Sequence, residues 1–304
     1  MKHKDNNDKT KCAPYLNFEN GSCIPLYVLV EMAFAYNKYN KEQKLNKKIY
    51  LNDQMDIDQP DKYKNYLVEE FKKRFNNDQK EWIKLKFIEL MSDEHKIFLH
   101  NGTFRPEGPH GQFDWLSTLD INKVLHQYEE KYDDFKFLGA VPIDFYDLDI
   151  PINFKHKQFF FKNLDFEYFI NNGINRFGIV FNLDESWKKG SHWVSLYFDL
   201  KKKQVYFSDS YGLKPEKRIS DFMDIIKNFM HTYNKFKTPE VRYNKKQHQE
   251  GNSECGVYSI NFILRLLKGK TFDNLTKNRI SDEKVNKCRL KYFDNTKQEK
   301  FKFK

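Results

Sequence analysis

The 304-residue sequence predicts an α+β fold in which a mainly helical region precedes a sheet flanked by helices. Apolar residues recur at helical spacing in much of the first part, and short aromatic and β-branched runs follow from about residue 137. The expected order of strands, helix, strand and helix in the second part lacks the regular alternation of a parallel α/β sheet. We therefore expect two regions, residues 1–135 and 136–304.

The first region begins with a polar stretch over residues 1–20, after which helices are expected. The segment PLYVLVEMAFAYN starts at Pro25 and places its apolar side chains on one helical stripe, and proline suits a first helical turn. Two further helices are expected over residues 61–75 and 79–92. The second of them has an apolar face that includes Trp82.

A loop and one more helix are expected to complete the first region. Residues 101–114 are rich in glycine and proline, which favours a loop. Asp120 is of a residue type that caps helices, so a helix is expected over residues 121–132. All candidate chemistry lies later in the chain, so we expect residues 1–135 to be dispensable for building the site and to serve substrate capture or location.

Aromatic and β-branched runs in the second region are expected to form strands. They are FKFLGAVPIDF, RFGIVFNLD, SHWVSLYFDL and KKKQVYFSDS, followed by the weaker candidate PEVRYNKKQ. The lysine-rich link 201–203 has the polarity of a turn between two adjacent strands. One helix is expected over residues 218–231 and another after Cys255, because apolar residues recur there at helical spacing.

Composition favours a soluble globular protein. Hydrophobic residues make up 39% of the chain, aromatic residues 17%, and the mean hydropathy is −0.84. No run of eighteen apolar residues occurs, so no membrane-spanning helix is expected. The first residues, MKHKDNNDKTKC, lack the apolar stretch of a secretory signal.

The net charge of +10 permits contact with acidic partners or nucleic acid. The 53 basic residues are scattered along the chain and not gathered in one tract. Nucleic-acid binding is therefore not expected to be the main function, although non-specific DNA contact through a basic surface stays an alternative.

The cysteines form no CxxC pair and are too sparse for a disulfide scaffold. They are Cys12, Cys23, Cys255 and Cys288. We expect all four to be reduced thiols in a cytosol-like compartment, each to be explained singly.

Cys255 stands at the start of an apolar helix in the segment EGNSECGVYSINFILRLLKG. Asn252, Ser253 and Glu254 are natural cap residues, which would place the thiol in the first helical turn. Free amides and the positive helix end stabilise a thiolate there, and the same amides can hold an oxyanion. The alternative is that Cys255 is a small buried hydrophobic side chain, as most free cysteines are.

His192 and Asp209 lie on two neighbouring expected strands. His192 enters the first strand and Asp209 follows the second, 17 residues later. Two adjacent antiparallel strands would bring both side chains to one sheet edge, where a carboxylate can orient an imidazole. A structural hydrogen bond for His192 and a turn position for Asp209 are the alternatives.

Gln249 lies six residues before Cys255, and its amide can donate a hydrogen bond to a tetrahedral intermediate. Gln247 and His248 are neighbouring rivals for that role, with a polar loop as the plain alternative.

Taken in order, these residues resemble the Ulp1/adenain group of cysteine proteases. The matching positions are His192 with Trp193, Asp209 with Ser210, Gln249, and Cys255 with Gly256. The resemblance covers about residues 175–268 and implies a papain-like, Ulp1-type core with these four side chains as its catalytic residues, and no cofactor. Many relatives have glycine three residues before the cysteine, where this chain has Asn252, so the approach loop is expected to differ near Gln249.

The early segment GSCIPLYVLVEMAFAYN and the segment beginning FRPEGPHGQFDW are similar to viral members of that group. The similarity implies a helical arm before a protease domain, and cleavage of structural precursors during virion maturation, often after Gly-Gly or Gly-X. It also implies location in the virion or the host cytoplasm, with a protein substrate as the partner.

Three alternatives stay open at this stage. The first is a deSUMOylase or other isopeptidase specific for ubiquitin-like proteins, and the second is an inactive interaction module with the same fold. The third is a zinc site, for which no ligand spacing is present. Its candidate ligands are Cys12, Cys23, His95, His100 and His110.

Overall fold

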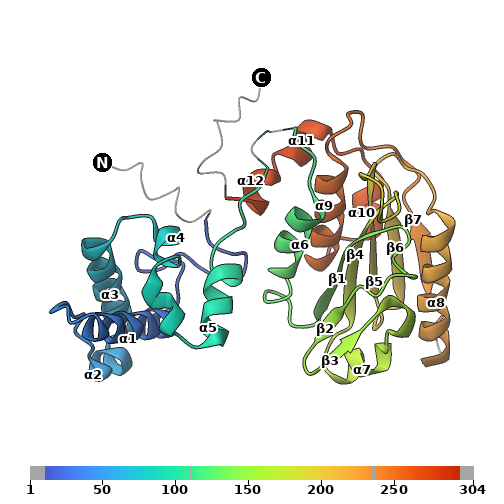
Figure 1. Cartoon of the computed structure of the whole chain (residues 1–304). Helices are drawn as coiled ribbons and strands as arrows, with labels where there is room; N and C mark the ends of the chain where they lie inside the picture. The colour runs from blue at the N-terminus through green and yellow to red at the C-terminus, as the bar shows by residue number, and fades with distance from the viewer. Residues whose placement is uncertain (1–10, 110, 112, 234–236, 295–304) are drawn as a thin grey trace. The chain divides into compact units, whose positions relative to one another are not determined.

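The computed structural model divides the chain into two compact units, residues 1–106 and 107–304 (Figure 1). The residues it describes are 11–109, 111, 113–233 and 237–294. Each unit has hydrophobic core residues of its own.

The first unit is helical, as the sequence predicts. Its elements are α1 (Leu26–Glu42), α2 (Asp53–Asp58), α3 (Pro60–Arg74), α4 (Gln79–Trp82), the 3₁₀ helix η1 (Lys86–Leu90), α5 (Asp93–Ile97) and the π-helical turn η2 (Phe98–Gly102). The expected helix over residues 79–92 is instead broken between α4 and η1. Asp78 caps α4, but Leu85 adopts extended backbone with ψ 145°, so the helix cannot continue through it.

Cys12 and Cys23 form a disulfide in the core of the first unit. The expectation of reduced thiols is therefore wrong for this pair, whereas Cys255 and Cys288 are free. The bonded sulfurs are also unavailable as zinc ligands, which removes two members of the alternative metal site. His110, another member, lies outside the described residues.

The second unit contains a mixed sheet in the order β1-β4-β5-β6-β7 and a separate hairpin. Its strands are β1 (Phe135–Pro142), β2 (Ile152–Phe154), β3 (Lys157–Phe159), β4 (Arg176–Asn182), β5 (Trp193–Asp199), β6 (Gln204–Ser208) and β7 (Glu240–Tyr243). The central strands β4, β5 and β6 are antiparallel, and the outer strands β1 and β7 run parallel to their neighbours. The predicted α+β class is confirmed.

Helices cover both faces of this sheet. They are α6 (Thr118–His126), the 3₁₀ helix η3 (Phe161–Asn163), α7 (Phe166–Asn171), α8 (Lys217–Tyr233), α9 (Cys255–Leu267), α10 (Phe272–Thr276), α11 (Asp282–Asn286) and α12 (Arg289–Tyr292). Alternate residues of β5 point to opposite faces: Trp193 and Tyr197 join the core with α6 and α9, whereas Val194 and Leu196 join the core with α8. Within the described ranges, no helix is both long and apolar enough to cross a membrane.

Helix α6 begins earlier than the expected span of 121–132. Ser117 is its N-cap and Asp120 completes a reciprocal capping box, so Asp120 lies inside the helix and is not its cap. The buried side chains of Ile121, Val124 and Leu125 belong to the core beneath α9. The units consequently divide at 106/107, before the boundary expected at 135/136.

Candidate active site

His192 and Asp209 meet at one end of two neighbouring strands of the sheet. His192 directly precedes β5 and Asp209 directly follows β6, and the two strands pair antiparallel with Ser195 opposite Ser208. The imidazole Nε2 lies 2.8 Å from Asp209 Oδ1. The His192 side chain is 13% exposed and that of Asp209 is 2% exposed, so their hydrogen bond is shielded from water.

Cys255 is the first residue of α9 and is 2% exposed. The Cys255 side chain is close enough to the His192 imidazole to raise its pKa, so the imidazole interacts with both Asp209 and Cys255. Glu254 occupies the N-cap position but makes no side-chain bond to the first turn, contrary to the expected capping. Its carboxylate accepts hydrogen bonds from Ser253 and from Asn286 in α11 instead.

The electrostatic environment favours the charged form of His192. Burial lowers the pKa of the imidazole, but hydrogen bonds and negative charge from Asp209 and Cys255 outweigh that cost. The net effect raises the pKa of His192 from 6.5 to about 9. At neutral pH the ring is therefore predominantly an imidazolium.

Tyr211 is a site residue that the sequence did not reveal. Its ring stacks on His192 with centroids 4.8 Å apart and planes inclined by 26°. Its backbone N–H donates to Asp209 Oδ1 at 2.8 Å, and its hydroxyl donates to the Gly251 carbonyl at 3.0 Å. Tyr211 thus fixes the imidazole plane and joins the histidine side of the site to the loop before Cys255. Its position two residues after Asp209 is the only sequence signal that points to it.

Asn244 is a second residue missed from the sequence. Its side chain accepts from the Asp209 N–H at 2.9 Å and donates to the Asp209 carbonyl at 2.6 Å. Asn244 follows β7, which is parallel to β6. Asn244, just after β7, therefore holds the backbone of Asp209 just after the adjacent strand β6.

Gln249 is fully buried and anchored to the residue after Asp209. Its Oε1 accepts from Ser210 Oγ at 2.6 Å, and its Nε2 donates to the Gly251 carbonyl at 3.0 Å. An amide nitrogen carries two hydrogens, so one Nε2–H is engaged within the loop.

The two rival residues near Gln249 point elsewhere. Gln247 donates its amide to the backbone carbonyl of Gln249 at 2.8 Å. His248 is buried, and its Nδ1 faces the Ile280 N–H at 3.4 Å. Burial, followed by the positive charges of Lys246, Arg279 and Arg265, lowers the pKa of His248, so this ring stays neutral near pH 7.

The segment before α6 packs against the residues that follow both His192 and Cys255. Trp193 points into the core, and its Nε1 donates to the Leu116 carbonyl at 2.9 Å. A Cβ placed on Gly256 would lie 3.0 Å from Leu116 Cβ, tighter than an ordinary contact, so glycine lets this segment approach α9 closely. Arg289, 2% exposed, donates to the Asp114 carbonyl at 2.7 Å.

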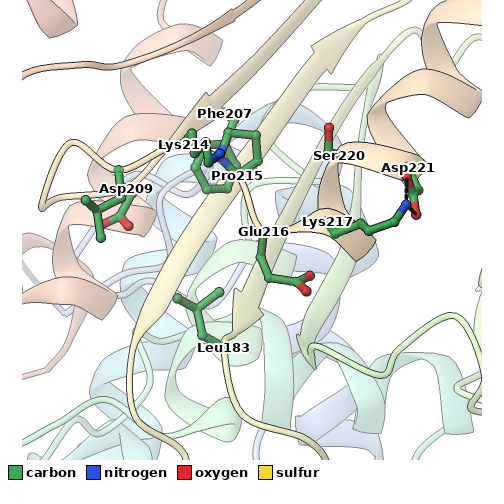
Figure 2. A pocket seen from close by; sticks show the side chains of 10 residues that line it. Leu183, Phe207, Asp209, Lys214, Pro215, Glu216, Lys217, Ser220 and Asp221 are labelled. Carbon is green, nitrogen blue, oxygen red and sulfur yellow. Dashed lines mark hydrogen bonds and ion pairs between the residues drawn. The ribbon is translucent and has the colours of Figure 1, made fainter.

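A cavity of about 560 Å³ borders Asp209 (Figure 2). It is lined by residues that follow β4, the end of β6 and the segment leading into α8: Leu183, Phe207, Asp209, Leu213, Lys214, Pro215, Glu216, Lys217, Ser220 and Asp221. Figure 2 shows Lys217 paired with Asp221 across one turn of α8, at 2.8 Å. The site therefore combines a Cys–His–Asp arrangement with a neighbouring hollow. Among the described residues, no group of three or more His, Cys, Asp or Glu side chains is arranged to hold a metal ion.

Comparisons with known proteins agree with this chemistry. Residues 179–301, which include all four candidate residues, match the Ulp1 protease family, C-terminal catalytic domain. The R355 protein of Acanthamoeba polyphaga mimivirus, a thiol protease by name, is 37% identical over 285 residues, or 91% of this chain and 90% of R355. A cysteine protease of African swine fever virus is 25% identical over 200 residues, or 62% of this chain and 71% of that protease.

The fold is shared as well. The crystal structure of the African swine fever virus protease matches with a TM-score of 0.60 at 19% identity, covering 93% of this chain and 95% of that chain. Similarity to R355 over nearly the whole of both sequences, together with the matched catalytic domain, establishes the relationship. The chain belongs to the Ulp1 (C48) family of cysteine proteases and is a thiol protease.

Proposed function

We propose that the protein is an endopeptidase in which Cys255 is the nucleophile, His192 the general base and acid, and Asp209 the group that orients the imidazole. The observation that carries this proposal is the hydrogen bond of His192 to Asp209, together with the position of Cys255 at the start of α9, where it raises the pKa of the same imidazole. The helix dipole and the first-turn amides favour a thiolate at that position.

The reaction follows from these contacts. His192 already holds the thiol proton as an imidazolium in the resting ion pair, and the Cys255 thiolate attacks the scissile carbonyl carbon. The C–N bond then breaks, His192 gives its proton to the leaving amine, and a thioester on Cys255 remains. Water, deprotonated by His192, attacks the thioester and releases the carboxylic acid and the thiol. First-turn amides of α9 and the second Nε2–H of Gln249 would hold the oxyanion.

The proposed substrates are structural precursor proteins of a virus, cleaved during virion maturation in the virion or the host cytoplasm. The viral origin of R355 and of the African swine fever virus protease supports this choice. The test is to incubate virion or host extracts with the protein or with its Cys255→Ala variant and to sequence the new N-termini. New termini that follow small residues, seen only with the unmodified protein, are expected. Identical fragments from both proteins would refute the proposal.

A second candidate is an isopeptidase for a ubiquitin-like modifier. Relatives from African swine fever virus carry the name SUMO-1 cysteine protease, which favours this reading. The two candidates are distinguished by comparing aminocoumarin derivatives of SUMO and ubiquitin with an aminocoumarin derivative of a short Gly-Gly peptide. A kcat/KM for the modifiers far above that for the peptide would favour the isopeptidase.

A third candidate is an inactive module that binds a protein partner. Iodoacetamide labelling of Cys255 across pH separates it from an enzyme, since an activated cysteine reacts well below pH 8.5, the usual pKa of a free thiol. Labelling that follows an ordinary thiol titration would favour the inactive module.

We also propose that the first unit captures substrate or directs location, and that it contacts polyanions. A cavity of about 790 Å³ in this unit has a cationic rim and no acidic lining residue; its basic side chains are Lys47, Lys48, Lys73, Arg74 and Lys86. Glu70 offsets part of that charge through ion pairs with Lys73 and Arg74. DNA affinity that falls steeply with salt, and falls further in a Lys47→Glu/Lys48→Glu variant, is expected. Salt-independent binding would refute the DNA contact.

A further inference from the structure

The cavity beside Asp209 has an apolar lining that the proposed chemistry does not use. Leu183, Phe207, Leu213 and Pro215 supply the apolar groups. Leu213 is 60% exposed, so a large aliphatic side chain faces solvent at the edge of a hollow that adjoins the candidate active site. Such exposed apolar surface in a concave site is typical of ligand binding.

The charged groups of the lining do not select a charged ligand. Lys217 pairs with Asp221 at 2.8 Å, and Asp209 is engaged by His192. The two remaining charged side chains, Lys214 and Glu216, have opposite signs. Because these charges balance, burial of apolar surface is left as the main source of affinity.

The position of the cavity indicates which part of a substrate reaches it. His192 is hydrogen-bonded to Asp209 and interacts with Cys255, and the cavity borders Asp209. In the proposed reaction the acyl part stays on Cys255, whereas the leaving amine receives its proton from His192. The chain after the scissile bond therefore starts beside the imidazole. An extended chain advances ~3.3 Å per residue, so a few further positions give it the length to reach a hollow that borders Asp209.

We propose that this cavity is a substrate subsite that accepts a large apolar side chain, such as leucine or phenylalanine, on the leaving-group side of the scissile bond. The subsite rests on the proposed endopeptidase function and adds a sequence requirement to it. Leu213 is a specificity residue of this subsite and takes no part in proton transfer.

Two substrates with the same Gly-Gly acyl part test the proposal in the full chain. The first is an internally quenched peptide series in which each of four leaving-side positions is in turn leucine or serine. The second is an aminocoumarin amide, which has no residues after the scissile bond. The variants are Leu213→Asp and Leu213→Ser. The matched control is Ile225→Asp, because Ile225 is aliphatic, 43% exposed and on α8 but does not line the cavity.

The unmodified protein is expected to prefer leucine over serine at one leaving-side position by about tenfold or more in kcat/KM, the usual value of one apolar pocket contact. Both Leu213 variants should lose this preference and keep aminocoumarin hydrolysis within about twofold. Ile225→Asp should keep both. Absence of a preference, or an equal loss on the aminocoumarin substrate, would overturn the subsite. If the unmodified protein cleaves neither substrate, the endopeptidase function itself fails.

Discussion

Replacing Asp209 with asparagine should move the basic limb of the pH–activity profile toward neutral pH. His192 has a pKa raised from 6.5 to about 9. This rise of roughly 2.5 pH units corresponds to about 3 kcal/mol in favour of the imidazolium. Among the groups that raise the pKa, Asp209 contributes more than Cys255 does. Asparagine keeps a hydrogen-bonding side chain but removes the charge, so a large part of that free energy should be lost.

The assay is kcat/KM on a short peptide from pH 5 to pH 10.5, for the unmodified protein and for Asp209→Asn. The unmodified protein should lose activity as pH rises through about 9, where the imidazolium that protonates the leaving amine disappears. Asp209→Asn should keep part of its activity near pH 6.5, with its basic limb at least one pH unit lower. An unchanged limb in the variant would refute the assignment of Asp209 as the group that charges the imidazole.

The same pKa shift predicts how stability depends on pH. A group whose folded pKa lies above its unfolded value stabilises the protein below the unfolded pKa, here about 6.5. That contribution is lost as pH rises through the folded pKa of about 9. The unfolding free energy of the second unit can be measured by denaturation monitored with near-ultraviolet circular dichroism. Between pH 6 and pH 9.5 this free energy should therefore decrease less for His192→Asn than for the unmodified protein. Equal decreases would contradict the shift.

Three further predictions follow from contacts in the second unit. Cys255→Ala and Cys255→Ser should abolish peptide cleavage and leave the circular dichroism spectrum unchanged. The control variant Cys288→Ala should cleave within a few-fold of the unmodified rate. Near-normal cleavage by both Cys255 variants would refute the assignment of Cys255 as the nucleophile. Gly256→Ala should reduce kcat and cost about 1–3 kcal/mol of unfolding free energy, because its Cβ would lie 3.0 Å from Leu116 Cβ in a packed core that resists the shift of Leu116. Unchanged values would refute the tight packing of Leu116 against α9. Because Leu116 and α6 belong to the core around α9, the part expected to be dispensable for the site shrinks from residues 1–135 to residues 1–106. A 107–304 fragment should cleave a short peptide, whereas a 136–304 fragment should be insoluble or inactive. An active 136–304 fragment would contradict this core assignment.

Local patterns in the sequence were sufficient to predict the central strands and the long helices. Aromatic and β-branched runs joined by a polar link predicted β5 and β6, and their antiparallel pairing is what brings His192 and Asp209 together. The apolar run after Cys255 predicted α9 because most of that helix is buried. These features depend on short stretches of chain, so a single sequence contains them.

Contacts between distant segments could not be predicted in this way. Tyr211 stacks on His192 only because the turn after β6 folds back, and Asn244 reaches Asp209 only through the parallel pairing of β7. The Cys12–Cys23 disulfide was missed because sparse cysteines carry no pairing signal in a chain of this length. The boundary between the two units was expected at 135/136 and not at 106/107, because the apolar face of α6 does not reveal in the sequence which core it joins.

The C-terminal segment also contributes to the nucleophile loop in a manner that no motif indicated. Asp282 accepts hydrogen bonds from the backbone of Glu250 and Gly251, and from the Tyr258 hydroxyl. Asn286 donates to Glu254, the residue before Cys255. The loop that positions the thiol is therefore held by residues about thirty positions further along the chain.

Trapping of the acyl-enzyme tests the central claim most directly. The protein is mixed with an activated Gly-Gly ester, quenched in acid within milliseconds to seconds, and digested for tandem mass spectrometry. We predict a thioester on Cys255 whose formation requires His192, so that the Cys255→Ala and His192→Ala variants show no adduct on the same timescale. An adduct on Cys288, or peptide cleavage by the Cys255→Ala variant at the unmodified rate, would contradict the account.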